Sequence, residues 1–118
     1  MPPEKEEEGE EVKTLKRKVQ LPCLLNVAMC KLKTGEKKEA IAACEKALAL
    51  DGKCVKAHYR KGAAYAEMCL YEEARASFER VLEIDGGNTE AQRELARLKK
   101  AEERSDRQQR KAFGNLFR

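Results

Sequence analysis

The chain repeats itself at an interval of about 34 residues, and this periodicity constrains its fold more than any other feature. When the sequence is shifted by this interval, seven residues across 39–52 meet an identical residue: Glu39 meets Glu73, Ala40 meets Ala74, Ala42 meets Ala76, Glu45 meets Glu79, Leu48 meets Leu82, Asp51 meets Asp85 and Gly52 meets Gly86. Such an interval is typical of helix-turn-helix units that each bury one face against the next unit. The sequence therefore predicts an all-α solenoid of stacked helical hairpins.

Hydrophobic spacing and turn residues place the helices within each unit. Ile41, Cys44 and Leu48 recur three and four residues apart, which is the pattern of an amphipathic helix. Gly35 is expected to cap a helix in the left-handed conformation, and glycines after Asp51 and Asp85 mark turns. We predict helices at residues 22–34, 37–50, 55–68, 71–84 and 88–111. Pro22 would lie in the first turn of the helix that it opens.

The same pattern divides the chain into segments with different roles. We predict an acidic disordered N-terminus at 1–11, a short helix or linker at 12–20, two repeats at 21–87 (21–54 and 55–87), a capping helix at 88–111 and a basic, aromatic tail at 112–118. Small residues at equivalent places, Ala28 and Gly62, would let the helices of each hairpin approach closely. Solenoids usually need about three units. We therefore expect marginal stability or self-association through the open N-terminal repeat face.

Composition argues against several classes of function. No stretch approaches the roughly 20 apolar residues that a membrane span requires. Acidic and basic residues are interleaved without an aromatic platform, which argues against nucleic-acid binding. The five cysteines are odd in number and lack CxxC spacing, and most fall where a helix would have a small apolar residue, which indicates reduced, buried thiols in a cytoplasmic or nuclear protein. The only histidine, His58, lies four residues from Cys54, but two ligands do not make a metal site. We expect no metal and no cofactor.

Three polar side chains are predicted to converge on one patch. Asn26 and Arg60 are one repeat interval apart, so they occupy the same position in adjacent units. Lys56 precedes Arg60 by one helical turn and shares its face. A guanidinium, an ammonium and a carboxamide together suit a pair of carboxylates. The alternative is that Lys56 and Arg60 are ordinary solubilising charges on a solvated helix.

Residues 22–95 resemble the last two repeats of the tetratricopeptide domain of FKBP-type immunophilin co-chaperones. The resemblance is carried by Leu25–Lys33 (LNVAMCKLK), Cys44–Asp51 (CEKALALD) and Lys56–Gly62 (KAHYRKG), with a last repeat that matches through Ala74–Phe78. The C-terminal stretch RKAFGNLF at 110–117 is similar to the basic tail of these proteins. The resemblance implies a co-chaperone module that binds other proteins in the cytoplasm.

The resemblance also implies a ligand and residues that bind it. In the family, a carboxylate clamp grips the acidic C-terminal peptide of heat-shock protein 90 and related chaperones, including the heat-shock protein 70 type. The matching residues here, Asn26, Lys56 and Arg60, would hold the terminal carboxylate and an acidic side chain. Met29, one turn from Asn26, would touch the apolar side chain of the peptide. The clamp's other lysine and asparagine come from a first repeat that this chain lacks, so we expect weak binding through a partial clamp.

Catalysis is not expected. Family members carry an upstream prolyl-isomerase domain that is absent here, which makes this chain either a fragment or a short relative. With three Phe, three Tyr and no Trp, it cannot supply an aromatic-lined isomerase pocket. The alternative identity is the non-catalytic part of an FKBP-type peptidyl-prolyl isomerase.

The tail offers a second interpretation. Lys111, Phe113, Leu116 and Phe117 combine a basic charge with apolar anchors, and the two phenylalanines are four residues apart, as anchors in a helix-binding groove are. In the family, this region is associated with calmodulin binding, so calmodulin is a candidate partner. The alternative is a frayed, solvated end of the capping helix.

Overall fold

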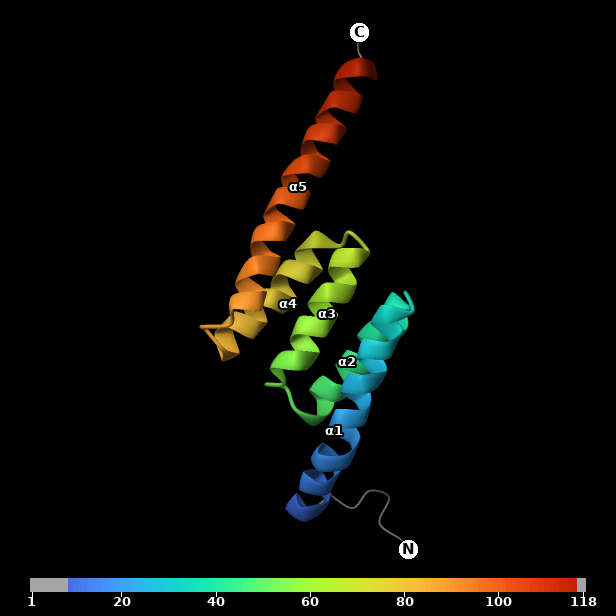
Figure 1. Ribbon diagram of the computed structural model, residues 1–118, viewed down its shortest axis with the longest axis vertical. Coiled ribbons are helices and arrows are strands. Elements are labelled where there is room, and N and C mark those ends of the chain that lie inside the picture. Colours follow the sequence, from blue (N-terminus) through green and yellow to red (C-terminus); the bar gives the residue numbers. More distant parts are fainter. Residues whose placement is uncertain (1–8, 117–118) are drawn as a thin grey trace, which may run out of the picture.

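The computed structural model describes residues 9–116, which form five α-helices and no strand within that range. The helices are α1 (Glu10–Lys33), α2 (Lys37–Leu50), α3 (Val55–Glu67), α4 (Tyr71–Ile84) and α5 (Thr89–Leu116). Figure 1 shows α1 with α2, and α3 with α4, as two stacked hairpins, and α5 beside α4 with its C-terminal end projecting beyond them. The predicted all-α solenoid of two repeats followed by a further helix is confirmed.

Stacking places the first helices of the two hairpins next to each other. α3 contacts α2, which precedes it in the chain, and also contacts α1. The groove that later carries the candidate site therefore lies between α1 and α3.

Small residues allow the helices of each hairpin to pack closely. In the first hairpin, Ala28 of α1 is fully buried in one cluster with Ala43 and Cys44 of α2. In the second, Gly62 of α3 faces Phe78 of α4, and a Cβ at residue 62 would lie 2.9 Å from the phenylalanine ring. Phe78 is the largest of the fully buried side chains. The expected close approach at Ala28 and Gly62 is therefore present, and at Gly62 no larger residue would fit without displacement.

The turns within the hairpins both use left-handed backbone. Gly35 ends the α1–α2 turn with a φ of 81°, as its predicted capping role requires. Cys69, one repeat interval later, has a φ of 60° in the α3–α4 turn. A side chain is disfavoured in this conformation, so the second turn is the more strained of the two.

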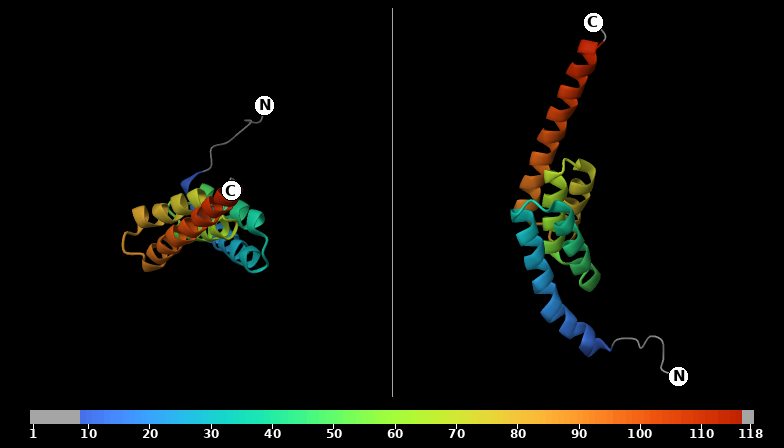
Figure 2. Two further views of the ribbon diagram at one scale, coloured as in Figure 1. Left: turned by 90° about the horizontal axis from the view of Figure 1, so that it is seen from above. Right: turned by 90° about the vertical axis from the view of Figure 1, so that its right-hand side faces the viewer.

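The predicted start of the first helix is wrong. α1 begins at Glu10 and runs through Pro22, so residues 12–20 do not form a separate element and Pro22 does not open a helix. A proline inside a helix removes one backbone hydrogen bond and bends the axis, and Figure 2 (right) shows α1 curving along its length. Glu10 and Glu11 belong to α1, so the disorder predicted for 1–11 does not extend to them. Residues 1–8 lie outside the described range.

Contacts with α2 and with the start of α3 compensate for the interruption. The Nε of Arg17 donates a hydrogen bond to the carbonyl of Leu50, the last residue of α2, over 3.0 Å. Leu21, Leu24 and Leu25 pack against the buried cluster of Ala47, Cys54 and Ala57. These interactions hold both sides of Pro22 on the body of the molecule.

α5 covers α4 with its first half and projects with its second. Ala91 and Leu98 are buried, and Leu98 lies in a cluster with Ala74 and Phe78. Arg75 of α4 is paired with Glu102 of α5, whereas residues 106–116 are all exposed. The helix continues past the predicted end at 111, so most of the predicted tail is helical. None of the helices in the described range combines the length and apolarity needed to cross a membrane.

Candidate functional site

Two adjoining hollows lie along the groove between α1 and α3, and the second extends to the start of α5. The first, which we term the basic pocket, has a volume of about 230 Å³ and is lined by Arg17, Leu21, Pro22, Leu25, Asn26, Lys56 and Arg60. The structure therefore places Asn26, Lys56 and Arg60 around one pocket. Three of these described lining residues are cationic and none of them is acidic. The pocket has the charge and the donors that a carboxylate requires.

A hydrogen bond between helices fixes the position of Arg60. Its Nη1 donates to the carbonyl of Leu25 in α1 over 2.7 Å, and the side chain is half-buried. Asn26 and Lys56 are exposed, so their polar ends are free to meet a ligand. The arginine thus acts as a rigid wall of the pocket, and its remaining N–H groups are available for a second acceptor.

The second hollow, which we term the apolar pocket, has a volume of about 520 Å³. Its lining residues are Met29, Leu32, Val55, Lys56, Tyr59, Arg60, Ala63, Asn88 and Glu90. Lys56 and Arg60 belong to both pockets, so the apolar pocket begins where the basic pocket ends. Met29, predicted to contact an apolar side chain, lies in this hollow.

Leu32, Val55 and Tyr59 were not predicted as members of the site. The sequence did carry a signal for Val55 and Tyr59. They are four residues apart on α3 and so share one helix face, on either side of Lys56 in the sequence. The Tyr59 ring packs edge-on against Phe78 with centroids 5.4 Å apart, which anchors the wall of the pocket in the core. Burial, with the nearby carboxylates of Glu94 and Glu90, raises the pKa of Tyr59. Its hydroxyl is therefore protonated at neutral pH.

Arg17 is a further residue that the sequence did not indicate. It lines the basic pocket, and it also lines a neighbouring hollow of about 320 Å³ together with Lys13, Lys16, Ala49 and Leu50. Arg17 precedes the first repeat, in the segment predicted to be a separate helix or linker. Repeat spacing could not identify Arg17, because Arg17 lies before the first repeat and the site residues were found by comparing positions within the repeats.

The cysteines provide no nucleophile in this groove. All five are free thiols, but only Cys44 and Cys54 are buried, so the predicted burial is wrong for Cys23, Cys30 and Cys69. Burial raises the pKa of the Cys44 thiol to about 11, although the nearby charges of Arg60 and Lys61 act in the opposite direction. Cys44 is therefore protonated at neutral pH and behaves as a small apolar core residue. Within residues 9–116, no three His, Cys, Asp or Glu side chains are grouped as metal ligands.

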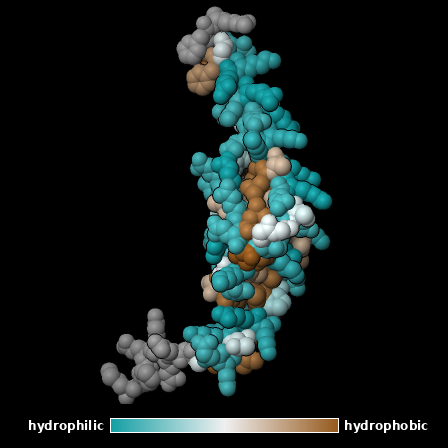
Figure 3. Space-filling model, turned by 90° about the vertical axis from the view of Figure 1, so that its left-hand side faces the viewer, coloured by the Kyte–Doolittle hydropathy of each residue, from teal (hydrophilic) through white to brown (hydrophobic). Residues whose placement is uncertain are grey.

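The predicted tail residues lie far along α5 from the segment that covers α4. Phe113 and Leu116 are 63% and 75% exposed, and Lys111 is exposed beside them. Phe117 lies outside the described residues. Figure 3 shows that the projecting end of α5 is mostly hydrophilic, with hydrophobic atoms near its tip, whereas the body carries a band of hydrophobic side chains. Calmodulin binding by this segment stays a prediction, as does self-association.

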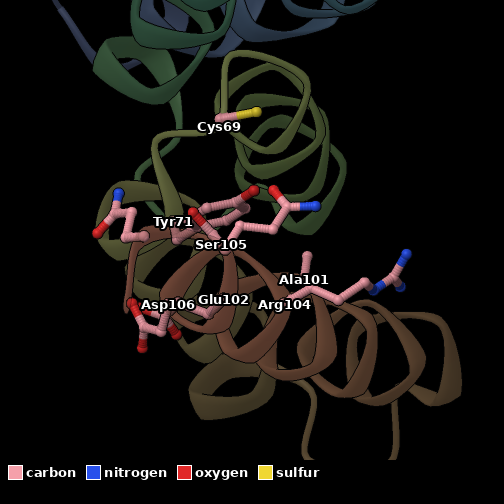
Figure 4. Close-up of a pocket in the computed structure, with 9 residues that line it drawn as sticks. Cys69, Tyr71, Ala101, Glu102, Arg104, Ser105 and Asp106 are labelled. Atoms are coloured by element: carbon pink, nitrogen blue, oxygen red, sulfur yellow. The ribbon is translucent and has the colours of Figure 1, made fainter. Parts of the chain in front are cut away.

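A larger hollow lies elsewhere in the described part of the chain and lacks grouped charge. It has a volume of about 720 Å³ between the α3–α4 turn and α5, where Cys69 and Tyr71 face residues 101–109. Figure 4 shows Arg104 extending away from Glu102 and Asp106, so the opposite charges lie on opposite sides. Glu102 is already paired with Arg75. This hollow has no arrangement that selects a charged ligand.

Comparison with protein families places repeats on the same two segments of the chain. Models described as "Tetratricopeptide repeat" match residues 21–54 and 55–88. The peptidyl-prolyl cis-trans isomerase FKBP4 of Mus musculus is 34% identical over 109 residues, which is 92% of this chain and 24% of that protein. The chain thus spans about a quarter of the length of this relative. The similarity is to its non-catalytic C-terminal region, and no isomerase domain is evident here.

Two similar solved structures contain bound peptides. The first TPR of Spaghetti (RPAP3), bound to the HSP90 peptide SRMEEVD, is 33% identical with a TM-score of 0.66, and the match covers 69% of this chain and 64% of that one. The second TPR domain of human RPAP3, in complex with the HSP70 peptide SGPTIEEVD, is 37% identical with a TM-score of 0.65, over 67% and 66% of the two chains. The resemblance inferred from residues 22–95 is confirmed by the FKBP4 similarity and the repeat matches.

Proposed function

This chain belongs to the tetratricopeptide repeat family, and we propose that it is a co-chaperone module that binds the acidic C-terminal peptide of a heat-shock protein 90 or 70 type chaperone. The observation that carries the proposal is the basic pocket, where Asn26, Lys56 and Arg60 meet and where no acidic residue is found among the described lining residues. Support also comes from the similar domains of RPAP3, which are bound to peptides ending in EEVD.

The two pockets suggest how such a peptide lies in the groove. The terminal carboxylate accepts hydrogen bonds from Lys56 and Asn26 and from the free N–H groups of Arg60 in the basic pocket. An apolar side chain of the peptide enters the apolar pocket against Met29 and Tyr59. Recognition therefore requires a chain end, an acidic group and an apolar side chain within a short segment. The reduced thiols favour the cytoplasm or the nucleus as the place where it acts.

The strength of binding follows from the small number of charged contacts. A hydrogen bond to a charged group contributes about 1.5–3 kcal/mol, and each 1.4 kcal/mol corresponds to about a tenfold change in affinity. A pocket with three polar contacts thus binds a free peptide weakly. This is the partial carboxylate clamp expected from the residues present.

Calorimetric titration with the peptide SRMEEVD tests the proposal. We expect measurable binding that falls at least about tenfold when the peptide's C-terminal carboxylate is amidated or when Lys56 is replaced in a Lys56→Ala variant. Lys46→Ala is the matched control, because Lys46 is an exposed lysine of α2 that lines neither pocket. Binding that is indifferent to amidation, or lost equally in both lysine variants, would contradict a clamp at this position.

A further inference from the structure

The part of α1 that precedes the first repeat adds a cation to the peptide groove. Arg17 lies outside the segment matched at residues 21–54, yet it lines the basic pocket together with Lys56 and Arg60. It also lines the neighbouring hollow with Lys13. The groove therefore continues past the repeat along the N-terminal half of α1.

The hydrogen bond of Arg17 leaves part of its guanidinium available. Its Nε donates to the carbonyl of Leu50 at the C-terminal end of α2, where helix carbonyls lack intrahelical partners and carry partial negative charge. With Nε engaged, the two Nη groups remain as paired donors. A guanidinium in this state can receive a carboxylate through two parallel hydrogen bonds.

Among residues 9–116, no acidic side chain neutralises the charge of Arg17. In the part of the chain that the structure describes, neither the basic pocket nor the hollow beside it has an acidic side chain in its lining. Within residues 9–116 no carboxylate forms an ion pair with Arg17, whereas Lys31 pairs with two glutamates and Lys61 and Arg75 with one each. An anchored guanidinium without a counter-charge, at the edge of a pocket for a carboxylate, is suited to a second carboxylate of the same ligand.

We propose that Arg17 is a specificity-determining residue that receives an acidic side chain near the C-terminus of the bound peptide, while Lys56 and Arg60 hold the terminal carboxylate. This inference rests on the function proposed above. It identifies the ligand as a segment with at least two carboxylates, one at the chain end and one on a preceding residue. Peptides with a free C-terminus but a neutral preceding segment are then poor ligands.

Calorimetric titration of paired peptides and variants tests this role. SRMEEVD is compared with SRMQQVD, in which both glutamates are replaced by glutamine. We expect Arg17→Gln to weaken binding of SRMEEVD by about tenfold or more and to change binding of SRMQQVD by less than about twofold, because the partner carboxylate is already absent. Lys18→Gln is the matched control: it removes the same charge from the next residue of α1, which is exposed and lines neither hollow.

Other outcomes separate this inference from the proposed function. If Lys56→Ala weakens binding while Arg17→Gln does not, or if Arg17→Gln weakens both peptides equally, the role of Arg17 is overturned and the groove remains the peptide site. If the wild-type chain binds neither peptide, both proposals fail. A second variant, Arg17→Lys, keeps the test informative if Arg17→Gln destabilises α1. It keeps the charge without the Nε bond, and it should retain at least part of the preference for SRMEEVD, whereas complete loss of that preference in a folded variant would leave Arg17 with only a structural role.

Discussion

The two hairpins of this solenoid share a backbone plan but pack around different residues. At equivalent positions, one repeat interval apart, the first hairpin pairs Ala28 with Cys44 and the second pairs Gly62 with Phe78. A larger side chain on one helix thus accompanies a smaller one on the other. The difference shows that the two hairpins fill their cores with different residues at equivalent positions.

The two hairpins also contribute differently to the site. The first hairpin supplies Arg17, Asn26 and the Leu25 carbonyl that holds Arg60. The second supplies Phe78, whose ring supports Tyr59 in the wall of the apolar pocket. The polar half of the groove therefore depends mainly on contacts between hairpins, and the apolar half depends on the core of the second hairpin.

The largest difference between the two hairpin cores is Phe78 in the second and Cys44 at the equivalent position of the first. Replacing Phe78 by cysteine tests this difference. We expect Phe78→Cys to lower the free energy of unfolding by about 3–5 kcal/mol, because it removes a fully buried ring and leaves a cavity against Gly62. Urea unfolding followed by circular dichroism measures the loss. Phe78→Leu, which retains more volume, should cost less, and a change below about 1 kcal/mol in Phe78→Cys would show that the second core does not depend on the ring.

Adding a methyl group at Gly62 tests whether the two residues of a pair are coupled. We expect Gly62→Ala alone to destabilise by about 1–3 kcal/mol, because the new Cβ would lie 2.9 Å from the Phe78 ring. In the double variant with Phe78→Cys, the cost of the alanine should largely disappear, since Ala28 and Cys44 already coexist in the first hairpin. Additive losses in the double-mutant cycle would mean that the pair is not coupled.

The turns offer a test with a smaller expected effect, in which the substitution should stabilise the protein. Cys69 has a φ of 60° where the first hairpin has Gly35. We expect Cys69→Gly to raise the free energy of unfolding by about 1 kcal/mol, since glycine relieves the left-handed strain. Gly35→Ala should have the reverse sign. Thermal unfolding compares the two variants, and a destabilised Cys69→Gly would indicate that the cysteine's contact with Tyr71 outweighs its backbone strain.

Alkaline pH should destabilise the first core through Cys44. Burial raises the pKa of Cys44 from 9.0 to about 11, so the folded state holds a proton that the unfolded state releases in this range. The contribution of Cys44 is fully present below pH 9 and declines as the pH rises towards 11. We expect the loss of stability between these values to be smaller in Cys44→Ala than in the wild type. Equal slopes in the two proteins, measured by urea unfolding, would contradict the assignment.

Much of the fold could be predicted because its signals are local. Hydrophobic spacing within α2 and α4 and the glycine at residue 35 depend on neighbours a few residues away, and the predicted bounds of 37–50 and 71–84 agree with those helices. The start of α1 could not be predicted in this way. Pro22 is a strong local signal for a boundary, but packing of the flanking leucines and the bond from Arg17 to Leu50 outweigh it.

The candidate site was predictable to the extent that it follows the repeat. Asn26 and Arg60 share a repeat position and Lys56 shares a helix face with Arg60, so their placement around one pocket followed from register alone. Arg17 and Tyr59 were missed because the first lies before the repeat and the second is an aromatic residue whose spacing also suits a core.

The sequence by itself determined the period of the chain, and with it the helices, the two hairpins and the residues that occupy equivalent positions. Only the tertiary structure decided which distant groups meet: Arg60 with the Leu25 carbonyl, Arg17 with the Leu50 carbonyl, and Phe78 with Gly62. The physical reason is the range of the interactions. Helix and turn formation depend on residues within one or two turns, whereas these contacts join residues on different helices and exist only after the hairpins have packed.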